Sequence, residues 1–101
     1  MEKYFIQVTV DFGHESIKDK SVKEIQKLLC TKADITKPMY RTGSYYRGLT
    51  NELANTKSYN KLSDALEKKR SMEVFDICSS VNFCILKIVK ARYDIVSLEE
   101  V

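Results

Sequence analysis

The sequence predicts a single α+β domain in which a mainly antiparallel sheet is covered on one face by two helices. Three observations carry this prediction: a strand-like alternation at the N-terminus, two segments with apolar residues at helical spacing, and an apolar strand near the C-terminus. At 101 residues the chain can build one modest core and has no room for a second, so residues 1–101 are expected to form one domain.

The first strand is expected over the opening dozen residues, where side chains alternate in character with a period of two. One face carries the apolar set Tyr4, Ile6, Val8, Val10 and Phe12. The other carries Phe5, Gln7, Thr9 and Asp11. Gly13 and His14 then break the pattern. The apolar face should meet the helices, and the face that ends in Asp11 should stay open to a partner.

Two helices are expected from capping residues and apolar spacing. The first is predicted over Ile17–Lys32, because Ser16 and Ser21 can each cap a helix start. The second is predicted after Ser58, and its basic end at Lys68–Arg70 suits the negative end of a helix dipole. Its apolar stripe consists of Tyr59, Leu62, Ala65 and Leu66.

The remaining strands are expected in three places. Met39–Leu49 favours an edge strand or short hairpin with a bulge at Gly43, and Met72–Cys78 favours a strand. Val81 to about Val96 favours a long strand whose first half is apolar on both faces, so it should be central or sandwiched in a dimer. The most economical arrangement of these elements is a ferredoxin-like split β-α-β domain.

Composition limits the class of protein more than it identifies one. The formal charge is +3, with 44% hydrophobic and 31% charged residues, which are ordinary values for a globular protein. No apolar run approaches the roughly 18 residues of a membrane span, and no secretory leader is visible, so a cytoplasmic location without membrane association is expected. Cys30, Cys78 and Cys84 lack metal-binding spacing and are expected to be reduced thiols, mostly buried.

The candidate catalytic residues are Asp11 and His14. A carboxylate at a strand end can hold Mg²⁺, and a histidine can act as a general acid or base. The structural alternative is that Asp11 is a turn residue or helix cap, and that His14 is a loop residue. The sequence has no P-loop, no G-x-G-x-x-G, no G-x-S-x-G and no metal-binding histidine pair. The familiar kinase, dehydrogenase and hydrolase mechanisms are therefore not expected, and no cofactor other than Mg²⁺ is implied.

A second group of candidates combines aromatic and basic side chains. Such residues can stack on bases and contact phosphates, but they also anchor protein interfaces or pair across strands. The candidate contact residues are Arg41, Tyr45, Tyr46, Arg47, Lys90 and Arg92. The last two join the basic end of the second predicted helix in a candidate basic patch, for which a solvated face is the alternative.

The layout resembles that of a known group of small proteins. The segments that carry the resemblance are Tyr4–Asp11, Tyr40–Gly48, Ser58–Lys69 and Met72–Ile77. They resemble the small CRISPR-associated ferredoxin-like nucleases, and their toxin and antitoxin relatives of the virulence-associated protein D and GhoS types. The resemblance implies a homodimer in which Asp11 lies at the two-fold interface and binds a divalent metal where cleavage occurs. The chain departs from the group by inserting Gly13 and His14 after the acid and by lacking a run of basic residues in its first helix.

Two functions from different classes follow. One is a nucleic-acid-binding protein, as a metal-dependent (ribo)nuclease or a toxin-antitoxin or defence component. The other is a non-catalytic inhibitor that binds a protein target, such as an immunity protein, an antitoxin or a phage-encoded anti-defence protein.

Overall fold

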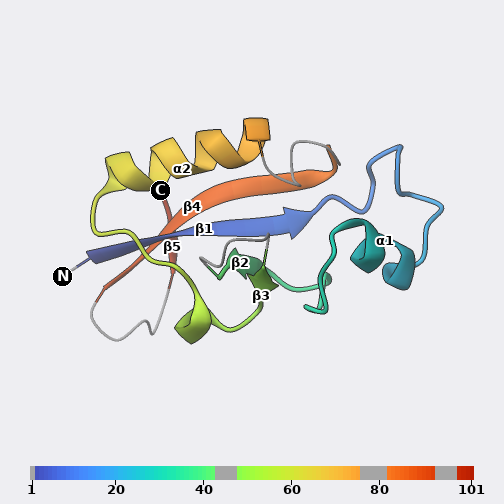
Figure 1. Ribbon diagram of the computed structural model, residues 1–101, viewed down its shortest axis with the longest axis horizontal. Helices are drawn as coiled ribbons and strands as arrows, with labels where there is room; N and C mark the ends of the chain where they lie inside the picture. The colour runs from blue at the N-terminus through green and yellow to red at the C-terminus, as the bar shows by residue number, and fades with distance from the viewer. Residues whose placement is uncertain (1, 43–47, 76–81, 93–97) are drawn as a thin grey trace.

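The computed structural model describes residues 2–42, 48–75, 82–92 and 98–101, and in these it shows a five-stranded antiparallel sheet with two α-helices and a short 3-10 helix (Figure 1). The elements are β1 (Glu2–Val10), α1 (Val22–Leu28), β2 (Met39–Arg41), β3 (Leu49–Thr50), η1 (Leu53–Asn55), α2 (Leu62–Phe75), β4 (Cys84–Arg92) and β5 (Glu99–Glu100). The strand order is β3-β2-β1-β4-β5. The α+β class is confirmed, and β4, which corresponds to the predicted long strand, lies inside the sheet as expected, next to β1.

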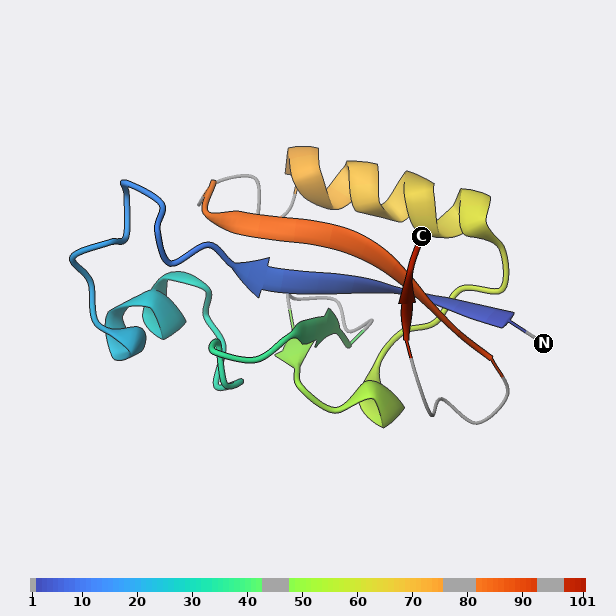
Figure 2. The same ribbon diagram turned by 180° about the vertical axis from the view of Figure 1, so that it is seen from behind.

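The ferredoxin-like split β-α-β arrangement is not confirmed. In that unit the strands on either side of a crossover helix run parallel, whereas β1 and β2, which precede and follow α1, are antiparallel neighbours. The length of α1 gives the physical reason. Its seven residues span about 10 Å, while the nine residues of β1 span about 30 Å, so α1 cannot carry the chain back along the sheet. Both views show α1 beyond the end of β1 (Figures 1 and 2).

The main core lies between the sheet and the two helices. Ile6 and Val8 of β1 are buried against Ile25 of α1 and Met72 of α2. The other members of this core are Ile17, Leu29, Ile35, Met39 and Phe83. Both helices therefore contribute to one core, although only α2 runs along β1 and β4 (Figure 1).

The opposite sheet face is partly covered, which corrects the expectation that it stays open. Phe5 is only 1% exposed and packs in a second core with Tyr40, Val89 and Ala91. Leu53 of η1 and Leu98 pack against this cluster, and η1 lies on the side of the sheet opposite α2 (Figure 2). The opposite face therefore contains a small core of its own at the Phe5 end of β1.

Helix α1 is shorter than predicted. Ser21, not Ser16, is its N-cap: Glu24 N–H donates to the Ser21 hydroxyl at 3.2 Å, and Ser21 N–H donates to the Glu24 carboxylate at 3.1 Å. Residues 14–20 form turns instead, with Ile17 and Lys18 N–H donating to the His14 carbonyl. The helix therefore starts where two backbone donors find side-chain partners.

The end of α1 is closed by a residue in the left-handed conformation. Cys30 has a backbone φ of 53°. Thr31 N–H donates to the Gln26 carbonyl, and Cys30 N–H donates to the Lys27 carbonyl, both at 3.1 Å. This is the Schellman pattern, in which glycine usually takes the left-handed position. Cys30 is exposed, contrary to the expectation of buried thiols; Cys84 is half-buried, and Cys78 lies outside the described residues.

Helix α2 differs from the prediction at both of its ends. It begins at Leu62, not after Ser58, because the chain at Tyr59 first forms a β-bridge with Tyr4. It then continues to Phe75, so the predicted strand Met72–Cys78 is wrong over Met72–Phe75, and its remainder lies outside the described residues. The bulge predicted at Gly43 also lies outside them. The short hairpin is confirmed as β2 and β3, and the predicted long strand is β4, which ends at Arg92.

No helix in the described part of the chain is both long and apolar enough to cross a membrane.

Replacing Cys30 with glycine is expected to stabilise the protein. Glycine adopts φ near 53° without the Cβ clash, and we expect the free energy of unfolding to rise by about 0.5–1 kcal/mol after the entropy of the unfolded chain is counted. Urea denaturation measures this change. Cys30→Ala is the control, because it removes the thiol and keeps Cβ; an equal gain in both variants would contradict the backbone explanation.

The capping box should make stability depend on pH. Hydrogen bonds from the Ser21 N–H and hydroxyl lower the pKa of Glu24 from 4.5, with smaller contributions from Lys20 and Lys27. Since the pKa is lowered on folding, ionised Glu24 stabilises the fold above pH 4.5, and this contribution disappears as the pH falls through the lowered value. The difference in unfolding free energy between the wild type and Glu24→Gln should therefore shrink between pH 7 and pH 3. A difference that is constant with pH would argue against this role.

Candidate functional site

An open pocket lined by three lysines lies beside α1. Its volume is about 620 Å³. The lining residues are Lys23, Gln26, Lys27, Cys30, Thr31 and Lys32. We call this feature the lysine pocket. Its residues belong to α1 and to the chain that follows it, and α1 lies beyond the end of β1 (Figure 1).

The helical repeat explains how these residues meet. Lys23 and Lys27 are four residues apart and so lie on the same face of α1. Ile25 is buried on another face and fixes the helix against the core. The left-handed turn at Cys30 reverses the chain, and Lys32 thereby joins the pocket.

Hydrogen bonds hold the segment that follows α1. The Gln26 side chain donates to the Ala33 carbonyl at 2.8 Å, and Ala33 N–H donates to the Thr31 hydroxyl at 3.0 Å. Asn51, next to β3, accepts from Asp34 N–H at 2.7 Å and donates to the Asp34 and Pro38 carbonyls at 2.9 and 3.0 Å. The wall of the pocket formed by Thr31 and Lys32 is thus anchored both to α1 and to the β2–β3 hairpin.

Three of the four carboxylates in the segment that forms the pocket contact groups other than the pocket lysines. Residues 14–37 contain six lysines and four acids, a net charge of +2. Glu24 accepts from the Ser21 backbone, and Glu15 pairs with Lys18 at 3.1 Å. Asp34 accepts from the Thr36 hydroxyl at 2.6 Å and from its N–H, and these bonds lower the pKa of Asp34.

The three lysines themselves are exposed, and among the described residues none of them forms an ion pair. A lysine ammonium is a compact charge with three donors, and it binds phosphate without a fixed geometry. An anion with several charged oxygens is therefore the chemistry that this pocket suits.

Asp11 lies in the turn after β1. Its N–H donates to the Phe83 carbonyl at 2.9 Å, and its carboxylate accepts from Gly13 N–H at 3.1 Å. Its carbonyl accepts from His14 N–H. These contacts match the turn role that was the structural alternative for Asp11.

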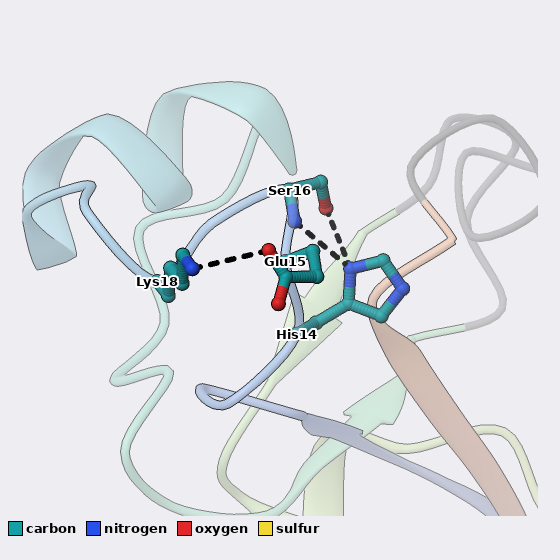
Figure 3. A network of polar contacts seen from close by, with 4 residues as sticks. All are labelled: His14, Glu15, Ser16 and Lys18. Atoms are coloured by element: carbon teal, nitrogen blue, oxygen red, sulfur yellow. Dashed lines mark hydrogen bonds and ion pairs between the residues drawn. The ribbon is translucent and has the colours of Figure 1, made fainter.

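His14 takes part in the same turn (Figure 3). Its Nδ1 lies 2.8 Å from the Ser16 hydroxyl and accepts from Ser16 N–H at 3.2 Å. The Ser16 hydroxyl also reaches Asn82, just before β4, at 3.4 Å. Within the described ranges no group of three or more His, Cys, Asp or Glu residues gathers as a metal site. Catalysis by His14 and Mg²⁺ binding at Asp11 stay predictions.

Only three of the predicted aromatic and basic contact residues, Arg41, Lys90 and Arg92, lie in the described part of the chain, so their joint role as a contact surface stays a prediction. Arg41 is half-buried on β2 and contacts Tyr59. Burial raises the pKa of the Tyr59 phenol, and the positive charge of Arg41, together with a hydrogen bond from it, opposes that rise. Lys90 on β4 pairs with Glu2 at 3.9 Å and Glu99 at 3.7 Å. Arg92 is the last residue of β4. The other three, Tyr45, Tyr46 and Arg47, lie outside the described residues.

The lysine pocket was not among the sequence candidates, although one signal pointed to it. Lys23 and Lys27 have the spacing of neighbours on a helix face. The position of Lys32 depends on the left-handed turn at Cys30, which no sequence pattern indicates for a cysteine.

Comparison of the chain with models of known protein families, with curated proteins and with solved structures found no match. The resemblance to the small CRISPR-associated nucleases and their toxin-antitoxin relatives stays a prediction.

Substitution of Asp11 separates the turn role from a metal role. In the turn role, Asp11→Asn keeps an acceptor for Gly13 N–H and should leave stability unchanged, while Asp11→Ala should cost about 0.5–1 kcal/mol. Urea denaturation tests both, and incubation of each variant with an RNA and DNA pool and Mg²⁺ tests cleavage. Mg²⁺-dependent cleavage that Asp11→Asn abolishes without loss of stability would support the metal role instead.

Proposed function

We propose that the protein binds nucleic acid through the lysine pocket. The observation that carries this proposal is the convergence of Lys23, Lys27 and Lys32 on one open surface where no described carboxylate pairs with them. Phosphate groups spaced along a nucleic-acid strand offer several anionic oxygens at once, and neutralising them releases counterions.

Sequence-independent binding is the form of recognition that this surface favours. The pocket lacks aromatic side chains on which bases could stack, and its charged groups are flexible lysines, which contact phosphates without reading bases. Three such contacts support only weak binding, with a dissociation constant on the order of 10⁻⁵ M at physiological salt.

The expected cytoplasmic location and the defence or toxin-antitoxin role are compatible with this proposal and add nothing to its support. The proposal contains no catalytic step. The protein-binding inhibitor stays the alternative that a negative result would favour.

The triple variant Lys23→Gln, Lys27→Gln, Lys32→Gln is expected to weaken binding and to reduce its salt dependence. Each single-strand phosphate contact contributes about 0.7 to the slope of log affinity against log salt, so loss of three contacts should reduce the slope by about two. Fluorescence anisotropy with a labelled oligonucleotide across a salt series, in RNA and DNA forms, measures both quantities.

The matched control is Lys3→Gln, Lys61→Gln, Lys68→Gln, which removes the same charge from residues outside the pocket. It should retain most of the slope. Equal loss in the two triple variants would mean that net charge alone attracts the oligonucleotide. Absence of binding by the wild type at low salt would overturn the proposal.

A further inference from the structure

The lysine pocket is compact. All of its lining residues come from the segment 23–32, so one short helix and the turn after it form the whole pocket. Lys23 and Lys27 are one helical turn apart, which is about 6 Å along the axis of α1. The volume of about 620 Å³ lies within the roughly 300–1,000 Å³ that is usual for small-molecule sites. The pocket therefore suits the end of a strand better than a continuous length of backbone, which needs an extended groove.

The charge of the lysine pocket matches that of a strand end. Three lysines line it, and none of the described lining residues is Asp or Glu. An internal phosphodiester carries a single negative charge, whereas a phosphate monoester carries about 1.5 to 2 at pH 7 because its second pKa is near 6. A terminal monoester and the adjacent diester together carry about 2.5 to 3 negative charges. Three lysines are sufficient to neutralise both groups.

Two uncharged side chains of the pocket carry donors that are held in place. The Gln26 amide donates to the Ala33 carbonyl at 2.8 Å, and the Thr31 hydroxyl accepts from Ala33 N–H at 3.0 Å. Both side chains are half-buried, whereas the three lysines are exposed. Among the described residues no acceptor takes the second N–H of the Gln26 amide or the O–H of Thr31. Donors that are already fixed lose little conformational entropy when they bind a ligand.

We propose that the lysine pocket binds the phosphorylated end of a nucleic-acid strand in preference to its interior. The Thr31 hydroxyl and the Gln26 amide donate to the three acceptor oxygens of the terminal phosphate, and the lysines neutralise this group and the adjacent diester. Recognition of the end is independent of base sequence, because it involves only phosphate contacts. The inference rests on the proposed function, since it names the class of nucleic acid that the same pocket binds.

The experiment compares one short single-stranded oligonucleotide with different ends. The strand is labelled at an internal base and prepared with hydroxyl groups at both ends, with a 5′-phosphate or with a 3′-phosphate. Fluorescence anisotropy at low salt should show that the wild type binds one of the phosphorylated forms about tenfold or more tightly than the hydroxyl form. This is the gain expected from one additional hydrogen bond to a charged group.

The matched ligand control is the same strand with its terminal phosphate converted to a methyl ester. This group keeps the phosphate but has only the single charge of an internal diester. Its affinity should be close to that of the hydroxyl form. Equal affinity for the methyl ester and the free monoester would overturn the proposal, because the end would then count only as one more diester.

The outcomes also separate this inference from the proposed function. Equal affinity for the hydroxyl and phosphorylated strands would overturn the preference for ends. If the triple variant of Lys23, Lys27 and Lys32 then lost binding, the proposed function would still be supported. Absence of binding by every strand at low salt would overturn both.

The variants Thr31→Val and Thr31→Ser test the hydroxyl contact. Valine keeps the shape of threonine and removes the O–H, so the preference for the phosphorylated end should fall by about fivefold, whereas serine should retain it. Valine also leaves Ala33 N–H without its partner. The affinity for the hydroxyl-ended strand, which should be unchanged in both variants, controls for a shift of the pocket wall. An undiminished preference in Thr31→Val would contradict the contact from Thr31.

Discussion

The nine-residue antiparallel ladder between β1 and β4 is the constraint on which the rest of the molecule depends. It runs in continuous register from Glu2 opposite Arg92 to Val10 opposite Cys84. Because successive side chains alternate between faces, the ladder supplies apolar residues to both sides of the sheet. Ile6 and Val8 form one core with the helices, and Phe5 and Val89 form the other. The shorter strands are attached to the two sides of this pair.

The length of the β1–β4 ladder also determines how the two helices pack against the sheet. Helix α2 packs along the pair, while α1 is too short to span it and closes the end of the core with Ile25 and Leu29. The region around α1 is consequently held to the sheet by a few buried side chains and by polar contacts such as those of Asn51. The lysine pocket belongs to this peripheral part of the molecule.

The features that were predictable from sequence are those with a local physical signal. Alternation identified β1, and Ser21 with Glu24 was one of the two helix starts that the sequence offered, although the prediction began the helix at Ile17. The continuation of α2 through Met72 was missed because β-branched and aromatic residues near Met72–Cys78 favour strands, whereas Met72 lies two helical turns after Ala65 and is buried on the same side. The antiparallel direction of β2 relative to β1 was also missed. It follows from the shortness of α1, and the predicted helix, Ile17–Lys32, was more than twice as long as the seven residues of α1. Among the site residues, only Lys23 and Lys27 carried a local signal.

Asn51 connects parts of the chain that are distant in sequence. Its amide holds the segment at Asp34 and Pro38, and this segment continues from the Thr31–Lys32 wall of the lysine pocket, whereas Asn51 itself follows the edge strand β3. Linkage between sites is reciprocal, so an anion that ordered this wall on binding would also restrain Asn51 at the end of the β2–β3 hairpin, and loss of the Asn51 contacts would weaken the binding of that anion by the same factor. The edge of the sheet and the pocket are thus joined through one side chain, although they are formed by different elements.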